Sequence, residues 1–398
     1  MALVNITARP PQVKRFALFE LGFRPMFLLA GSGAVVLMSL WLLMLAGWMR
    51  VPPYYAGNWW HIHEMLLGYV PAVVVGFLLT ASRNWTGVQT LSGGWLAALS
   101  GLWLAARILP FTALPGVLTA VTDLAFLLLA AVAVAIPVVR VRQYNNMIFA
   151  PMVLGLWLAN LLMHLQLLGI SANTAVSGER LGIALIVLLI VVMGSRVLPF
   201  FIEMGTAQRD ATRKYHGIEI AGNIVTAAWA LYYTFMGNDS VAGLLALSAA
   251  TLLGIRAAGW HVRALWGVPL LWILYLGFLW VPLGLLLFFF AAMGWTAGSY
   301  AIHALTAGAM GIMTLGMMSR VILGHTGREM RHSPLLVMAF ATILATPLFR
   351  LLPAIPLFAD DYYFMIHMAG GLWFLAFLLF LMRFAGWLLL PRADGRPG

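Results

Sequence analysis

Residues 58–87, "NWWHIHEMLLGYVPAVVVGFLLTASRNWTG", decide the fold class of this chain. Their centre is an apolar run long enough to cross a bilayer, which takes about 20 residues of helix. Two histidines and a glutamate stand at the start of the run, at His61, His63 and Glu64. Ionisable side chains are costly inside a membrane and mark functional sites where they occur. The stretch therefore predicts a membrane-spanning helix with a polar site at one end.

The composition also places the chain in a membrane. Hydrophobic residues make up 63% of the 398 residues and charged residues only 9%, which leaves too little polar surface for a soluble domain. The net charge of +11 comes from Lys and Arg spread between apolar segments, a pattern of loop anchors that argues against nucleic-acid binding. Because the chain has no cysteine, disulfides, thiolate metal sites, iron–sulfur clusters and covalently attached haem are excluded.

We predict an all-α integral membrane protein with about twelve transmembrane helices, counted by the length that crosses a bilayer. The predicted helices are 26–48, 60–81, 93–109, 116–137, 147–170, 181–202, 218–236, 241–257, 268–293, 299–320, 335–354 and 362–390. A cytoplasmic segment 1–25 precedes this single membrane domain 26–390, and a cytoplasmic tail 391–398 follows it. Both termini are predicted in the cytoplasm, because Lys and Arg then gather on that side. The exceptions are Arg50, Arg107, Arg180 and Arg350.

Three Ser-Arg pairs indicate an internal repeat. Arg83, Arg196 and Arg320 end the second, sixth and tenth predicted helices, roughly a third of the chain apart. The spacing predicts three quasi-repeats of four helices each, at 26–137, 147–257 and 268–390. Coincidence is the alternative, since Arg commonly ends a membrane span.

Several histidines share one depth in this topology. The predicted outer ends of four helices carry His61, His63, His164, His303 and His367, with Glu64 beside them. Histidine is a common ligand of metals and of haem iron, so the shared depth predicts an intramembrane cofactor site. The alternative for each residue alone is an interfacial anchor or a hydrogen bond to a carbonyl.

The spacing within the second helix separates its two histidines. His61 and Glu64 lie on one face, whereas His63 points about 200° away from His61. One helix therefore presents the histidines to two centres, a haem on one side and a second metal or a polar partner on the other. Glu64 could orient an imidazole, bind the second metal or relay protons.

Other polar residues extend this hypothesis. Arg350 and Arg107 could pair with haem propionates, or they could simply reach the interface. Asp123, in the fourth helix, has no obvious basic partner. In the tenth helix His303, Met310 and Met317 repeat every seven residues; packing is the preferred reading of the methionines. Glycines Gly308 and Gly311 thin the same helix, where a flat cofactor could lie.

The segments "WWHIHEMLLGYVPAVVVGFLLTASRNWTG", "GSRVLPFF", "HALTAGAMGIMTLGMMSRVILGHTGR" and "FRPMFLLAG" resemble the NnrS family over essentially the whole chain. The resemblance implies a bacterial inner-membrane protein that binds haem and copper and is associated with denitrification and the response to nitric oxide. The conserved histidines of the family map onto His61, His63, His303 and His325. A more distant architectural likeness links the chain to the catalytic subunit of haem–copper oxidases and nitric oxide reductases. Unlike them, it lacks intramembrane histidines in spans six and seven.

The leading hypothesis is a haem b and copper protein that binds or processes nitric oxide near the periplasmic face, supplied by an unknown electron donor. Its preferred haem ligands are His63 and His303, with His61, Glu64, His367 and His164 around the second metal. The exchange of His61 and His63 is left open. The alternatives are a metal or small-solute transporter that uses the histidine layer as its transit site, and a haem-based sensor or assembly factor without turnover.

Overall fold

The computed structural model describes residues 16–331 and 333–396, and the described residues form helices and turns with no strand. Residues 1–15 of the predicted cytoplasmic segment and 397–398 of the predicted tail lie outside this range. The first third of the chain contains α1 (Phe23–Leu45), α2 (Trp59–His63), η1 (Glu64–Tyr69), α3 (Val70–Thr86), α4 (Gly93–Ile108), η2 (Leu109–Phe111) and α5 (Gly116–Arg140).

The middle third contains η3 (Tyr144–Asn146), α6 (Phe149–Leu167), α7 (Thr174–Thr206), α8 (His216–Met236), α9 (Ser240–Trp260) and η4 (Arg263–Gly267). The last third contains α10 (Pro269–Ala292), α11 (Gly298–His303), η5 (Ala304–Met310), α12 (Gly311–His325), α13 (Pro334–Leu351), η6 (Leu352–Ala354), η7 (Pro356–Phe358) and α14 (Tyr362–Leu389). Helices α2, η1 and α3 run on as one segment, as do α11, η5 and α12.

The predicted all-α membrane fold is confirmed. Among the described residues, 11 helical segments are long and apolar enough to cross a membrane, and every predicted span coincides with a helix. The predicted span 218–236 is α8, which is not among the eleven. Polar side chains such as Glu219, Asn223 and Thr226 lower its hydropathy.

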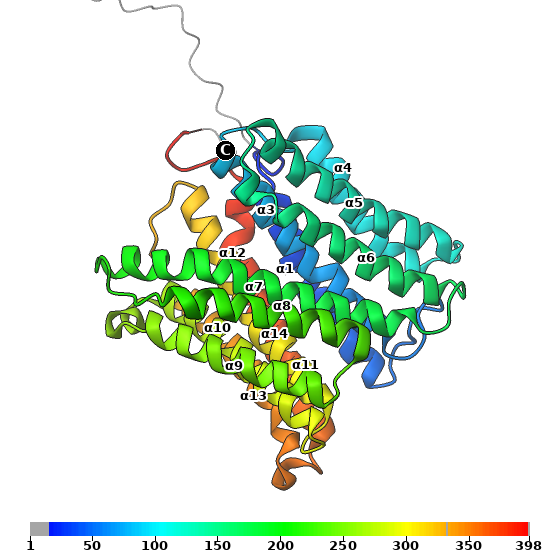
Figure 1. Ribbon diagram of the computed structural model, residues 1–398. Coiled ribbons are helices and arrows are strands. Elements are labelled where there is room, and N and C mark those ends of the chain that lie inside the picture. Colours follow the sequence, from blue (N-terminus) through cyan, green and yellow to red (C-terminus); the bar gives the residue numbers. More distant parts are fainter. Residues whose placement is uncertain (1–15, 332, 397–398) are drawn as a thin grey trace, which may run out of the picture.

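The helices form one bundle in which sequence neighbours pack side by side, as α7, α8 and α9 do in green in Figure 1. Helix α14 packs against α1, so the first and the last described helices meet within the bundle. The second helices of the three predicted repeats also meet: α12 contacts α3, and α7 contacts η1 and η5. The three-repeat organisation itself stays a prediction.

Two membrane spans contain a π-helical turn immediately after a histidine. In the second span, η1 follows His63, and in the tenth, η5 follows His303. Such turns are rare and occur frequently at functional sites. Because a π turn advances the chain by more residues per turn, it changes which side chains share a face.

The glycines of the tenth span have a different role from the one the sequence suggested. A Cβ on Gly308 would lie 2.7 Å from the indole of Trp280, and one on Gly311 would lie 2.5 Å from the ring of Trp373. The thinned surface of this helix is therefore filled by two tryptophans from α10 and α14. It does not hold an open groove at these glycines.

Candidate cofactor site

A cavity of about 450 Å³ lies between α1, α2, η1, α7, α11, η5, α13 and α14. We call it the histidine cavity because His61 and His303 line it from two different spans. Arg350 from the end of α13 and Glu179 from α7 also line it, while most of the remaining wall is apolar. Ligand sites have volumes of about 300–1,000 Å³ and combine an apolar wall with a few polar groups, so this cavity is a candidate binding site.

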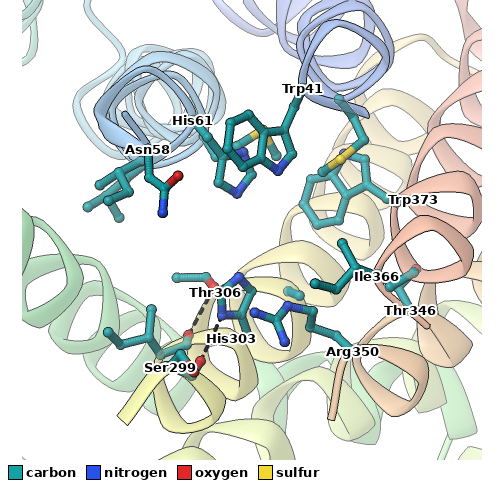
Figure 2. A pocket seen from close by; sticks show the side chains of 18 of the residues that line it. Trp41, Asn58, His61, Ser299, His303, Thr306, Thr346, Arg350, Ile366 and Trp373 are labelled. Atoms are coloured by element: carbon teal, nitrogen blue, oxygen red, sulfur yellow. Dashed lines mark hydrogen bonds between the residues drawn. The ribbon is translucent and has the colours of Figure 1, made fainter. Parts of the chain in front are cut away.

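His61 stands on α2 against the indole of Trp41 from α1. The two rings stack, with centroids 4.4 Å apart and planes 11° from parallel, as Figure 2 shows at one side of the cavity. The Nδ1 atom of His61 is buried and has no hydrogen-bond partner among the residues that the structure describes. A buried polar atom without a partner is costly, which indicates that this imidazole is placed for something other than packing.

His303 is held at the opposite side of the cavity, beside Arg350 (Figure 2). Its Nδ1 atom lies 2.7 Å from the carbonyl oxygen of Ser299, one turn earlier in the same helix. The carbonyl can only accept, so Nδ1 carries the proton and donates. A neutral imidazole then keeps its lone pair on Nε2, which is the arrangement of most metal-bound histidines.

Arg350 brings a positive charge to the cavity wall. Its side chain lies between the rings of Tyr300 and Tyr362, at 6.0 Å and 5.9 Å from their centroids. The Nη1 atom is buried and finds no hydrogen-bond partner in residues 16–331 and 333–396. None of the ion pairs among the described residues joins a carboxylate to this guanidinium, whose side-chain hydrogen-bond partner is Tyr362. Because a desolvated cation needs compensation, the cavity favours a ligand with an anionic group at this end.

A second group, the buried polar cluster, surrounds the side chains of His63 and Glu64, which follow His61 in the second span. It consists of Glu64, Arg107, Asp123, His63, Asn160 and His164, all at most 7% exposed. The Nε atom of Arg107 lies 2.8 Å from Glu64 Oε2, and its Nη2 atom donates to Asp123 Oδ1. The cluster thus joins four helical segments, η1, α4, α5 and α6, together with His63 at the end of α2.

Both histidines of the cluster approach one carboxylate oxygen. Asp123 Oδ2 lies 3.0 Å from His63 Nε2 and 3.2 Å from His164 Nε2. The atoms that His63, Asp123 and His164 could offer to a metal ion all lie within 4.8 Å of one another. Two ligands of a tetrahedral ion, each at about 2.0–2.1 Å, are about 3.3 Å apart. The separations of the three residues around Asp123 Oδ2 are therefore close to those of a shared metal ion.

The charges of the cluster support a bound cation or proton. Glu64 and Asp123 contribute two negative charges when ionised, and Arg107 contributes one positive charge. With neutral imidazoles one negative charge remains, and a buried uncompensated charge is costly. A metal ion, or a proton on His63, would balance it.

The structure separates the predicted site residues into two groups. His61 lines the histidine cavity, whereas His63 belongs to the buried polar cluster. His61, rather than His63, lines a cavity together with His303, whereas the pairing of His63 with His303 as haem ligands stays a prediction. His164 lies with His63 at the cluster. His367 is half-buried, bonds through Nδ1 to the carbonyl oxygen of Tyr363 at 2.7 Å, and does not line the cavity.

The two arginines of the predicted site also lie in different places. Arg350 lines the histidine cavity, but Arg107 does not; it pairs with Glu64 and Asp123 instead of facing a cofactor there. The expectation that Asp123 lacks a basic partner is therefore wrong. His325 lies at the other end of the tenth span, 3.3 Å from Asn84 through Nε2.

Some residues of the two sites were not found by sequence reasoning. Asn160 Nδ2 donates to Asp123 Oδ2 at 2.8 Å, and it stands one turn before His164, so the i, i+4 pair of polar residues in an apolar helix was an available signal. Tyr54 and Tyr55 bond His164 and His63 at 2.8 Å and 3.0 Å. Trp41 and Glu179 carry no comparable local signal.

Gly68 makes room for the cluster. A Cβ at this position would lie 2.5 Å from Arg107 Nη1 and 2.9 Å from Glu64 Oε2. We expect Gly68→Ala to displace the guanidinium and to lower the free energy of unfolding by about 1–3 kcal/mol, measured as a lower unfolding midpoint in detergent. Gly101→Ala is the control, because nothing lies within 4 Å of its added Cβ. An equal loss in both variants would contradict this reason.

Comparison with known proteins adds one finding. The family model described as NnrS protein matches residues 17–392. That range is nearly the whole chain, and it includes every residue of the histidine cavity and of the buried polar cluster. No curated protein matches the chain.

Proposed function

The chain belongs to the NnrS family, and from that premise we propose that it is a haem- and copper-binding membrane protein that binds or processes nitric oxide. One observation carries the proposal: His61 and His303, from the second and tenth spans, line a single cavity together with the unpaired charge of Arg350. Histidine is the usual axial ligand of a non-covalently bound haem, and a cysteine-free chain excludes thiolate ligation.

The residues of the histidine cavity fit haem b. His61 and His303 are the proposed iron ligands, and Arg350 is the proposed partner of a propionate, since its Nη1 atom is buried without a partner. When bound, haem iron supplies a site for a diatomic ligand and a redox centre. Ligation by one histidine would leave a position for nitric oxide, whereas ligation by both would favour electron transfer. Trp41 keeps the His61 ring in one orientation by stacking.

The buried polar cluster is the proposed copper site. Imidazole ligands suit copper, zinc and iron, and His63, His164 and Asp123 offer two imidazoles and a carboxylate. Glu64 Oε1 lies 3.2 Å from His63 Nδ1, so we assign Glu64 to orienting this imidazole and Arg107 to balancing the charge of both carboxylates. His367 is not assigned to either centre, because it lines neither.

The proposed location is the bacterial inner membrane, with both termini in the cytoplasm and the two sites near the periplasmic face. The distribution of Lys and Arg along the chain supports this orientation. Nitric oxide is apolar and partitions into lipid, so a site within the bilayer would meet it there. Reduction of the haem would need an electron donor, which we propose is a separate protein.

The test is an optical spectrum of the protein purified from cells replete in haem and copper, with a pyridine haemochrome assay and metal analysis. We expect a b-type haem and about one copper per chain at the His63–His164 site. Addition of nitric oxide to the reduced protein should shift the spectrum. A protein with neither haem nor copper would overturn the proposal and favour the transporter; haem without a nitric oxide response would favour electron transfer.

A further inference from the structure

A second, smaller cavity lies elsewhere in the bundle, and the proposed function leaves it without a role. It has a volume of about 80 Å³ and lies between α1, α3, α7, η5 and α12. We call it the apolar cavity, because no charged residue lines it and methionines form much of its wall. Those methionines are Met193, Met310, Met313 and Met317, so the methionine stripe of the tenth span finds its place here.

The two cavities meet at shared walls. Val70 and Met310 line both the histidine cavity and the apolar cavity. Val70 is the first residue after η1, and Met310 is the last residue of η5. The π-helical turn η1 thus leads from His63 to Val70, and η5 leads from His303 to Met310. Both turns end where the two cavities share a wall. Methionine is flexible and changes rotamer easily, so Met310 is the more adaptable of the two side chains at the junction.

The wall of the apolar cavity offers almost nothing to a polar ligand. Its one hydroxyl belongs to Thr314, which donates to the carbonyl oxygen of Met310 at 2.7 Å and lies 2.6 Å from Tyr69 Oη. An ion or a water molecule would lose hydrogen bonds there that the wall cannot replace. Apolar cavities stay dry and bind apolar molecules such as xenon.

We propose that the apolar cavity is a second binding site, for a small uncharged apolar molecule of the size of a diatomic gas. From it the molecule passes between Val70 and Met310 into the histidine cavity. The binding step stands by itself, whereas delivery to a cofactor rests on the proposed function. A gas dissolved in the bilayer would thereby be concentrated beside the site while ions are kept out.

Xenon tests the binding step without any cofactor. Anomalous diffraction from xenon-pressurised crystals of the full chain should show a peak between α3, α7 and α12. The Ile190→Phe variant, which places a larger ring in the cavity wall, should lose the peak. Ile224→Phe is the matched control, because Ile224 is 62% exposed on α8, and it should keep the peak. A wild-type protein without xenon between these helices would overturn the proposal, even if every variant failed to fold.

Flash photolysis of carbon monoxide from the reduced haem-loaded protein tests the delivery step. Ile190→Phe should slow bimolecular rebinding several-fold and leave the haem spectrum unchanged, whereas Ile224→Phe should rebind at the wild-type rate. Unchanged rebinding in Ile190→Phe, together with a lost xenon peak, would overturn delivery. A protein that binds xenon but no haem would overturn the proposed function and leave the binding site standing.

Discussion

The His303→Ala and His61→Ala variants are expected to lose the haem that the wild-type protein carries. Each substitution removes one imidazole from the histidine cavity, and alanine offers no atom that could replace an axial ligand. Loss of a residue that merely supports a ligand costs about 10–100-fold in metal affinity, so loss of the ligand itself should cost more. The measurement is the haem-to-protein ratio of the purified variants by pyridine haemochrome.

The control for this experiment is His367→Ala, which should keep its haem. His367 lies near the start of α14 and does not line the cavity, so it matches the others in residue type and in its place near the start of a membrane span. The variant His63→Ala separates the two possible pairings. Loss of haem in His63→Ala, with full haem in His61→Ala, would contradict the assignment and restore the pairing of His63 with His303.

Helix positions could be predicted because they depend on local chain properties. A bilayer imposes one minimum length on every apolar span, and each predicted span coincides with a helix. The divergence of His61 and His63 was predictable for the same reason, since it needs only the 100° rotation per residue of a helix. In the structure these side chains indeed belong to the histidine cavity and to the buried polar cluster.

Pairings between helices could not be predicted in this way. Arg107 and Asp123 come from α4 and α5, and their ion pair depends on how far each helix is rotated toward the other. A single sequence contains no direct record of that rotation, so Asp123 seemed unpaired and Arg107 seemed free to bind a cofactor. The π-helical turns after His63 and His303 could not be predicted either, because the apolar pattern around them is compatible with a regular α-helix.

The Arg107→Leu variant is expected to destabilise the protein more than any other substitution in the buried polar cluster. It would leave Glu64 and Asp123 as two buried carboxylates without a guanidinium. Removing one partner of a buried ion pair costs about 3–5 kcal/mol, which is a large part of the stability of a typical protein. We expect a strongly lowered yield and a lower unfolding midpoint in detergent, whereas Arg50→Leu, at an exposed arginine, should behave as wild type.

The double variant Arg107→Leu/Glu64→Gln shows whether charge is the cause. It removes one positive and one negative charge, so the net charge of the cluster returns to the wild-type value. The packing contacts of the Arg107 side chain are not restored. Partial recovery of the unfolding midpoint relative to Arg107→Leu would establish that the guanidinium acts by compensating charge. If the double variant is no more stable than the single one, the arginine acts through shape, and the argument that the cluster needs a cation loses its support. Metal analysis of the double variant then adds an independent measure, because a restored balance of charge should also preserve copper at His63 and His164.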